Sequence, residues 1–244
     1  MSGRPAPTLF DRVAFEWMPP ARYLKVHPYW VDELATGKRV RVDPRLGNPY
    51  STGRLAQHVA GHSGPAAVAM SYVASTGAAA LFEALFRNAP ILPGHRVYLE
   101  PAKLANWCLT ELTLVRPVEV FPAGLPERKM TVTSAHKDAA WRRLISTGNH
   151  STTWPPAIRL AAELHADGKT LGGITWNSIQ CPGGGAVYLL YDPPNGPGLW
   201  TDVHTTRLES GRGQTAIRRA LSACGYTWIN TGWVDHFGPS PGDL

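Results

Sequence analysis

The chain has little cysteine and no long apolar run, and both absences narrow its class. No run of about 18 apolar residues occurs among its 244 residues, so we expect no membrane-spanning helix. The N-terminal stretch lacks a continuous apolar segment, so we expect no secretory signal. Three widely spaced cysteines, Cys108, Cys181 and Cys224, form no metal-binding pattern and no even disulfide framework. These absences predict a protein of the reducing cytoplasm.

Strong charge of one sign is also missing. The formal net charge is +6, with nine histidines counted as neutral. A mild basic excess favours an anionic partner, such as a nucleotide, a nucleic acid or an acidic protein. The basic residues are scattered as the pairs Lys38-Arg39, Arg142-Arg143 and Arg218-Arg219, and no dense basic stripe with interleaved aromatics occurs. We therefore expect no direct binding to DNA or RNA.

Proline and glycine are plentiful, and 22 prolines and 24 glycines cut the chain into short elements. The pattern predicts strands over 22–26, 67–74, 96–99, 110–120, 171–176 and 186–191. It predicts helices over 77–88, 134–145, 155–165 and 214–222, the first with an N-cap at Ser75-Thr76. Residues 31–66 are expected to form a long structured loop with little regular structure. Strands mixed with a few helices favour an α+β fold over a doubly wound parallel sheet.

Three motif-like stretches have simpler explanations than a catalytic or metal site. Gly61-His62-Ser63-Gly64-Pro65 resembles a nucleophile elbow, but proline stands where that motif needs its second glycine. His58 and His62 have the spacing of two metal ligands on one helix face, yet no third ligand suggests itself. The glycines at 183–185 lack the lysine of a phosphate-binding loop, so they predict a hairpin turn. We therefore predict no metal site.

A single carboxylate, Glu83, lies on the otherwise apolar helix predicted over 77–88. Leucines and phenylalanines occupy much of the helix surface around it. Burying a carboxylate there costs free energy unless it is paired or hydrogen-bonded. By pattern alone, the favoured interpretation is a glutamate on the one wet side of the helix, paired with Arg87 at i+4.

Polar residues at four places in the chain occur in an order known from one protein family. They are Arg22-Tyr23, then Arg45-Leu46-Gly47-Asn48-Pro49 or Gly53-Arg54-Leu55, then Ser71-Tyr72-Val73-Ala74-Ser75 with Glu83 eleven residues after Tyr72, and Gly173-Ile174-Thr175-Trp176-Asn177-Ser178. Together they resemble the RES-domain family, named for Arg, Glu and Ser, over roughly residues 20 to 195. Members of that family are NAD-consuming bacterial toxins of toxin–antitoxin pairs. The second arginine is ambiguous, because leucine stands beside both candidates where the family usually has an aromatic residue.

This resemblance implies cleavage of the bond between nicotinamide and ribose in NAD. That bond breaks through an oxocarbenium-like transition state, which an ionised carboxylate near the sugar stabilises. Glu83 is the expected catalytic carboxylate. Arg22 is expected to hold the pyrophosphate, since a forked guanidinium suits phosphate oxygens. Ser178 is expected to donate a hydrogen bond to phosphate, ribose or the nicotinamide amide.

The resemblance implies further contacts to NAD from arginine and tyrosine side chains. Arg45 or Arg54 is expected to add a second phosphate contact. Tyr23 and Tyr72 offer flat amphipathic faces for stacking on nicotinamide or for closing the pocket. NAD is here a substrate, so no separate cofactor is expected, and the chemistry needs neither a metal nor a covalent nucleophile. The sequence leaves open whether the acceptor is water, phosphate or a protein side chain.

The resemblance also implies an organisation and a partner. We expect one ADP-ribosyltransferase-like domain with a mixed β core flanked by helices over 21–195. Outside the matched residues we expect an irregular N-terminal arm over 1–20 and a C-terminal extension over 196–244, whose Trp200, Trp228 and Trp233 indicate that it packs on the same domain. A toxin of this kind implies a cognate antitoxin. Two alternatives stay open: an ADP-ribosyltransferase that modifies a protein target, and a catalytically inactive domain that binds NAD or a partner. The oligomeric state stays open as well, a homodimer included.

Overall fold

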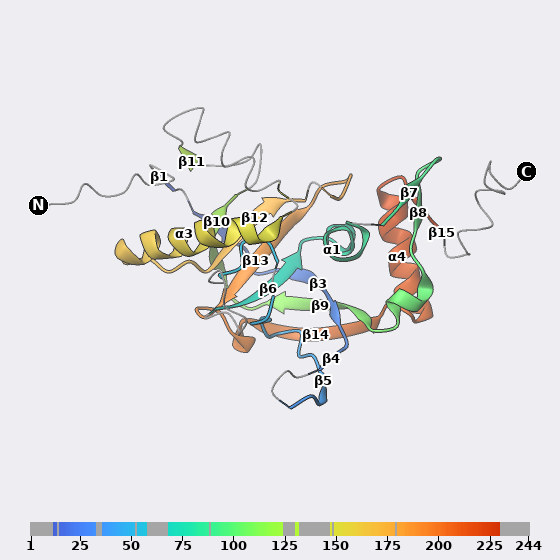
Figure 1. The fold of residues 1–244 in the computed structure, drawn as a ribbon, viewed down its shortest axis with the longest axis horizontal. Coiled ribbons are helices and arrows are strands. Elements are labelled where there is room, and N and C mark those ends of the chain that lie inside the picture. The colour runs from blue at the N-terminus through green and yellow to red at the C-terminus, as the bar shows by residue number, and fades with distance from the viewer. Residues whose placement is uncertain are drawn as a thin grey trace, which may run out of the picture.

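The fold is built on one mixed β-sheet with helices packed on it, as Figure 1 shows. The computed structural model describes residues 12–13, 15–32, 36–51, 53–57, 68–87, 89–123, 130–131, 147, 149–178 and 180–229. The α+β class predicted from the sequence is confirmed. The helix predicted over 134–145 lies outside the described residues. No helix in the described ranges is both long enough and apolar enough to cross a bilayer.

Eight strands form the main sheet, in the order β14-β9-β3-β6-β13-β12-β10-β2. Their bounds are Trp200–Arg207 (β14), Trp107–Leu114 (β9), Arg22–Pro28 (β3), Ala69–Ala74 (β6), Ala186–Asp192 (β13), Gly173–Asn177 (β12), Val118–Pro122 (β10) and Glu16–Met18 (β2). Neighbouring strands are antiparallel except β10 and β12, which are parallel. The sheet is therefore mixed, as expected.

The main sheet includes strands from outside the predicted domain over 21–195. The expectation of a wholly irregular arm over 1–20 is wrong for β2, in which Met18 is fully buried and pairs with Val118. Three residues are too few to show a strand alternation, and the partner strand is far away in sequence. At the other edge, β14 lies within the predicted C-terminal extension and pairs with β9.

Smaller strand groups flank the main sheet. β7 (Ile91–Leu92), β8 (Arg96–Tyr98) and β15 (Thr227–Ile229) form one; β4 (Trp30–Asp32) with β5 (Arg39–Arg41), and β1 (Arg12–Val13) with β11 (Met130–Thr131), form two more. β5 and all of β4 except Trp30 lie within the loop expected over 31–66. Each has three residues, so the turn-forming residues around them dominated the sequence pattern.

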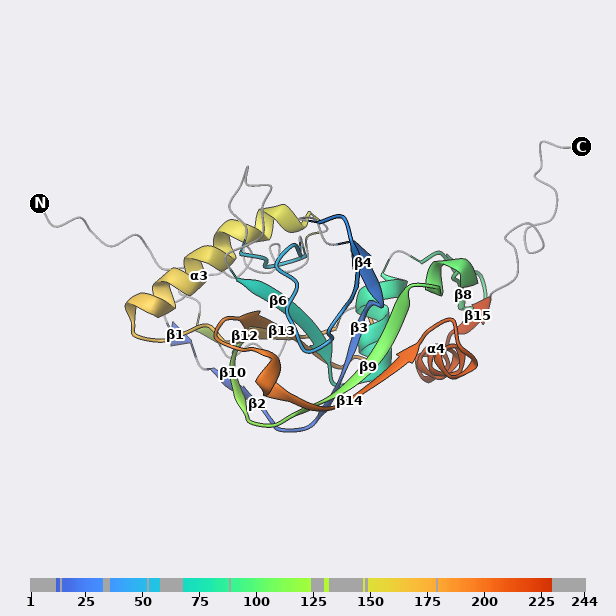
Figure 2. The same ribbon diagram turned by 90° about the horizontal axis from the view of Figure 1, so that it is seen from below.

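α3 (Trp154–Ala166) and α4 (Gly211–Ala223) lie on opposite sides of the molecule, as the perpendicular view shows (Figure 2). α1 (Gly77–Leu81) lies between them, where it packs on the central strands β3, β6 and β13 and on α4. Single-turn 3₁₀ segments occur at η2 (Pro101–Leu104), η3 (His150–Thr153) and η4 (Pro197–Leu199).

The α1 segment does not run on as the regular helix predicted over 77–88. Thr76 caps it, accepting a hydrogen bond at 3.1 Å from the Ala79 N–H, which confirms the predicted N-cap. After Leu81 the chain widens into a π-helical turn, η1 (Phe82–Phe86), that contains Glu83. Turns of this kind are rare and occur frequently at functional sites.

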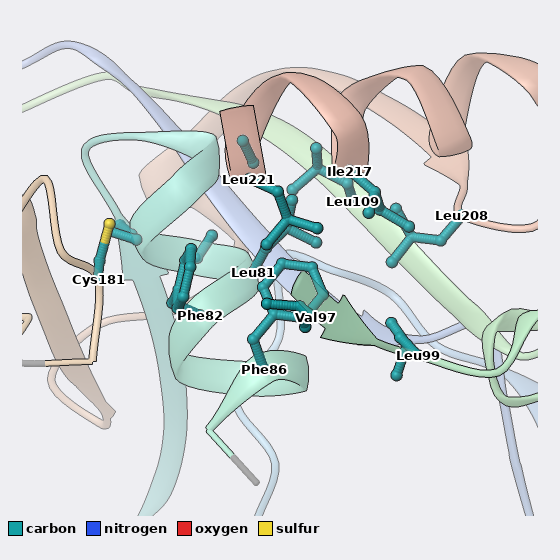
Figure 3. Close-up of a cluster of buried hydrophobic side chains, with 14 of the residues drawn as sticks. Leu81, Phe82, Phe86, Val97, Leu99, Leu109, Cys181, Leu208, Ile217 and Leu221 are labelled. Carbon is teal, nitrogen blue, oxygen red and sulfur yellow. The ribbon is translucent and has the colours of Figure 1, made fainter. Parts of the chain in front are cut away.

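A large apolar cluster fixes this segment against α4 and β8. Leu81, Phe82 and Phe86 point into it from the helical segment, and Ile217 and Leu221 meet them from α4 (Figure 3). These side chains are all at most 4% exposed. The cluster therefore holds the backbone around Glu83 in place while the carboxylate itself points away from it.

The two faces of the main sheet have different roles. Along β6, Tyr72 and Ala74 point to the face that packs on α3 and α1, whereas Ser71 and Val73 point to the other face. The second face carries its own core, which includes Tyr23, Leu112 and Trp200. This alternation decides which of the predicted site residues can reach Glu83.

Candidate functional site

Glu83 and Ser178 lie side by side, although they are 95 residues apart in the sequence. The Ser178 hydroxyl donates a hydrogen bond to Glu83 Oε1 at 2.7 Å. The Glu83 side chain is only 12% exposed, and Ser178 is 5% exposed. The structure thus brings together two of the three residues predicted as catalytic.

Arg87 completes the coordination of the Glu83 carboxylate. Its Nη2 donates to Glu83 Oε2 at 2.8 Å, one helical turn away at i+4. The pairing expected from the helix pattern alone is therefore present together with the serine contact. Among the described residues each carboxylate oxygen has one donor, and each keeps a lone pair for a further hydrogen bond.

A short turn behind Ser178 holds its hydroxyl in place. The Cys181 N–H donates to Ser178 Oγ at 3.1 Å, so the serine proton is directed to Glu83. The Ser178 N–H donates to the Gly185 carbonyl at 2.9 Å, which closes the turn. Gly185 has φ +125°, and a Cβ there would lie 2.9 Å from Ala79 Cβ. Glycine is thus required where this turn approaches α1.

Arg54 lies close enough to influence the same charges. It is 9% exposed, and its Nη2 donates to the Thr147 carbonyl at 3.1 Å. Burial lowers the pKa of Arg54, and the nearby Arg87 lowers it further, while Glu83 acts in the opposite direction. The Tyr72 hydroxyl donates to the Arg54 carbonyl. Of the two candidate arginines, Arg54 is the one whose charge interacts with Glu83 and Arg87.

His150 is a neighbour that the sequence analysis did not identify. Its Nε2 lies 3.1 Å from Arg87 Nη1. Because a guanidinium only donates, Nε2 accepts and the imidazole proton is on Nδ1. Burial lowers the pKa of His150, and Arg87 and Arg54 lower it further, which favours this neutral form. No local motif marks His150, which is 63 residues from Arg87.

Three buried N–H groups around the site have no hydrogen-bond partner within the described part of the chain. They are Arg54 Nε, Arg87 Nε and Trp176 Nε1. The Trp176 ring packs edge-on against Tyr72, with centroids 6.2 Å apart. An unsatisfied buried donor costs about 1–3 kcal/mol. A ligand rich in oxygen acceptors would satisfy these donors.

Tyr23 is not available for stacking on a substrate, so that expectation is wrong. Tyr23 points to the opposite face of the sheet from Tyr72 and is 2% exposed. Its hydroxyl donates to the Pro19 carbonyl at 2.8 Å, and its ring packs edge-on against Tyr188 and Trp200. The alternation of side chains along β3 is the physical reason.

Arg45 and Arg22 do not contact the Glu83–Ser178 pair. Arg45 lines a small cavity with Ser71 on the second face of the sheet, and its guanidinium pairs with Asp43 at 2.7 Å. Arg22 lies three strands from β12, and its side chain is 72% exposed with Glu111 at 3.4 Å. A role for Arg22 in binding substrate stays a prediction.

Comparisons with known proteins give little further guidance. No family model and no curated protein matches the chain. One solved structure, described as the crystal structure of the M. tuberculosis MbcT–MbcA toxin–antitoxin complex, aligns with a TM-score of 0.40 and 13% sequence identity. The alignment covers 77% of this chain and 84% of that chain. The chain is thus similar to that structure in part of its fold.

Proposed function

We propose that this protein cleaves the nicotinamide–ribose bond of NAD, with Glu83 as the catalytic carboxylate. One observation carries the proposal: a nearly buried carboxylate holds the Ser178 hydroxyl on one oxygen and the partly exposed Arg87 on the other, beside the buried Arg54. The order of Tyr72, Glu83 and Ser178 in the sequence, which resembles the RES-domain family, adds the substrate class.

Glu83 would act on the sugar through its charge. Bond cleavage develops positive charge on the ribose ring, and a carboxylate fixed nearby stabilises it most strongly where water is excluded. The free lone pairs on its two oxygens can accept hydrogen bonds from ribose hydroxyls, which orients the ring. Ser178 and Arg87 hold the carboxylate so that it need not reorganise during the reaction.

The arginines would bind the diphosphate of NAD. Arg54 and Arg87 each have a buried Nε–H without a partner among the described residues. Phosphate oxygens are strong acceptors, and guanidinium–phosphate hydrogen bonds are charge-assisted. Tyr72 and Trp176 supply the aromatic surface beside these groups. This assignment uses Arg54 in place of Arg45 and leaves Tyr23 without a substrate contact.

The first test is incubation of the purified protein with NAD while free nicotinamide and ADP-ribose are measured. Release of both without added protein supports a glycohydrolase, and a requirement for inorganic phosphate supports a phosphorylase. Transfer of labelled ADP-ribose to a polypeptide would instead support the ADP-ribosyltransferase alternative. Binding of NAD without turnover would support the inactive binding domain and overturn the proposal.

Replacement of the carboxylate provides the decisive variant. Glu83→Gln should lower the rate of nicotinamide release by roughly 100- to 1,000-fold, the usual cost of losing one electrostatic contact to the transition state. Glu163→Gln is a matched control, because Glu163 also pairs with an arginine one helical turn away, Arg159 four residues earlier, on a more exposed helix face. Equal activity in both variants would contradict the role of Glu83.

We further propose that NAD cleavage makes the protein a toxin that a cognate protein neutralises. The resemblance to the RES-domain family is the support for this step. Expression of the chain alone should arrest growth, and expression of Glu83→Gln should not. Arrest by both forms would separate toxicity from the Glu83 site.

A further inference from the structure

Two thiols from distant parts of the chain meet beside Ser178. Cys181 Sγ and Cys224 Sγ are 3.5 Å apart, although 43 residues separate them in the sequence. Cys181 is 3% exposed and lies in the turn after Ser178; its thiol points toward the helical segment that carries Phe82 (Figure 3). Cys224 is half-buried and ends α4. Both are free thiols in this structure.

We propose that Cys181 and Cys224 are a peroxide-reactive pair that closes into a disulfide and ties the Ser178 turn to α4. A disulfide needs sulfurs about 2.05 Å apart, so they must approach by about 1.5 Å. Each cysteine has a glycine with positive φ nearby: Gly184, three residues after Cys181, at +70°, and Gly225, directly after Cys224, at +77°. These turns can adjust more easily than a helix or strand interior.

The packing of the turn supports direct contact between the two segments. A Cβ built on Gly183 would lie 3.7 Å from Cys224 Sγ, so the backbone of the turn lies against that thiol. Cys108, the third cysteine, is fully buried in β9, and the structure gives it no cysteine neighbour in the described ranges. Cys181 and Cys224 are therefore the pair expected to react, and Cys108 serves as an internal control.

Hydrogen peroxide supplies the oxidising equivalents. The Cys224 thiolate attacks one peroxide oxygen, the O–O bond breaks, and the departing hydroxide takes up the thiol proton as water. The Cys181 thiol then attacks the sulfenic sulfur of Cys224, the S–O bond breaks, and a second water leaves. Two thiols are oxidised and one peroxide is reduced to two waters.

The order of the two steps follows from the environments of the thiols. Burial and the neighbouring Cys224 thiol raise the pKa of Cys181 to about 11, so little of it is thiolate near neutral pH. Cys224 is the more exposed of the two and meets peroxide first. Cys181 then reacts with the sulfenic acid of Cys224 to form the disulfide, because the two sulfurs are already in contact.

The disulfide would act on the candidate site through the backbone of Cys181. The same residue donates its N–H to Ser178 Oγ, and Ser178 donates to Glu83. Fixing the Cys181 side chain to α4 restricts the turn that directs the serine hydroxyl. Oxidation would thus change the mobility of the site without any direct chemistry on Glu83 or Ser178.

The test counts free thiols in the denatured protein after peroxide treatment. The wild-type count should fall from three to one, with loss of two hydrogens by mass and a tryptic peptide pair linking Cys181 to Cys224. Dithiothreitol should restore three. Cys108→Ala should fall from two thiols to none, whereas Cys224→Ser should form no intramolecular link. Three surviving thiols, or a link that involves Cys108 or a second chain, would overturn the proposal.

A second measurement tests the tie to the site. Hydrogen exchange of the peptide containing Cys181 should slow in the oxidised protein, and the melting temperature should rise by roughly 5–10 °C, since the bridge closes a long loop. Unchanged exchange would show that the disulfide does not restrain the Ser178 turn. Neither readout uses NAD, so failure here is distinct from failure of the proposed reaction.

Discussion

At the scale of single residues, the arginines beside Glu83 differ from an ordinary surface arginine. Arg54 is buried, its Nη2 donates to the Thr147 carbonyl, and its Nε–H has no acceptor within the described ranges. Arg45 is partly exposed and forms three hydrogen bonds to the Asp43 carboxylate. A guanidinium whose donors are already satisfied gains little from binding a phosphate.

This difference predicts distinct effects of the same conservative change. Arg54→Lys keeps the positive charge but removes the fork and the buried Nε–H, so the apparent KM for NAD should rise roughly 10- to 100-fold. Arg45→Lys should leave KM within about twofold. Steady-state kinetics of nicotinamide release measure both. A larger effect at Arg45 would contradict the assignment of Arg54.

The sequence identified the residues whose type was unusual for their surroundings. Glu83 was conspicuous as an acid on an apolar helix, whereas Ser178, one of several polar residues at a strand end, was identified only through the resemblance to the RES-domain family. Arg87 was predicted only as an ordinary i+4 partner, and His150 was not predicted. Neither is unusual in its local sequence, and their proximity depends on how the η3 segment meets the π-helical turn. The exclusion of Tyr23 depended on which face of β3 packs on α1.

At the scale of elements, the turn between β12 and β13 and the N-terminus of α1 form one unit. The turn carries Ser178, and Gly185 packs directly on Ala79 and Thr76 of the helix start. The predicted hairpin turn at 183–185 is confirmed by the antiparallel pairing of β12 and β13. The sequence did not predict that one of these glycines, Gly185, also lets the start of α1 pack closely against the turn.

This contact predicts a specific sensitivity at Gly185. Gly185→Ala should lower the free energy of unfolding by about 1–3 kcal/mol, because the new Cβ would lie 2.9 Å from Ala79 Cβ and 3.1 Å from Thr76 Oγ1. Gly184→Ala is the matched control: φ is also positive, at +70°, but nothing lies within 4 Å of the added Cβ. Urea denaturation compares the two. Equal losses of stability in the two variants would show that the positive φ, and not the contact with α1, causes the effect.

Strand prediction succeeded where the pattern was long and failed where tertiary structure decided. β3, β6, β12 and β13 were all predicted in place. The strand expected over 110–120 is instead two strands, β9 and β10, interrupted at the exposed Val115 and its neighbours. Val115 is apolar but 49% exposed, so its residue type did not indicate that β9 ends there. The sequence pattern did not predict β14, because most of its side chains are exposed at the edge of the main sheet.

At the scale of the whole molecule, the second face of the sheet buries a polar network away from the candidate site. His27 is 5% exposed; its Nδ1–H donates to the Pro28 carbonyl, and its Nε2 accepts from Thr110. Lys25, 8% exposed, donates to the Pro44 and Leu46 carbonyls and to Ser71 Oγ. These groups couple the stability of the fold to pH.

His27 predicts a loss of stability in acid. Burial lowers its pKa from 6.5 to about 4, so the unfolded chain binds a proton that the folded protein does not. The free energy of unfolding is therefore larger by about 3 kcal/mol above pH 6.5 than below pH 4, and this difference is lost as the pH falls from 6.5 to about 4. His27→Gln, which does not titrate, should flatten this dependence in urea titrations at pH 7 and pH 4.5. The exposed His165→Gln should not, and an equal effect would contradict the role of His27.

The distance along the chain between Glu83 and Ser178 has a consequence for the newly made protein. At about 5–20 residues per second, a ribosome adds the glutamate roughly 5–19 s before the serine that binds it. α4, which covers the π-helical turn, follows later still. During that interval Glu83 can pair with Arg87 but not with Ser178, the apolar helix around it is uncovered, and the site is not assembled. Synthesis order therefore delays any activity until most of the sheet has been made.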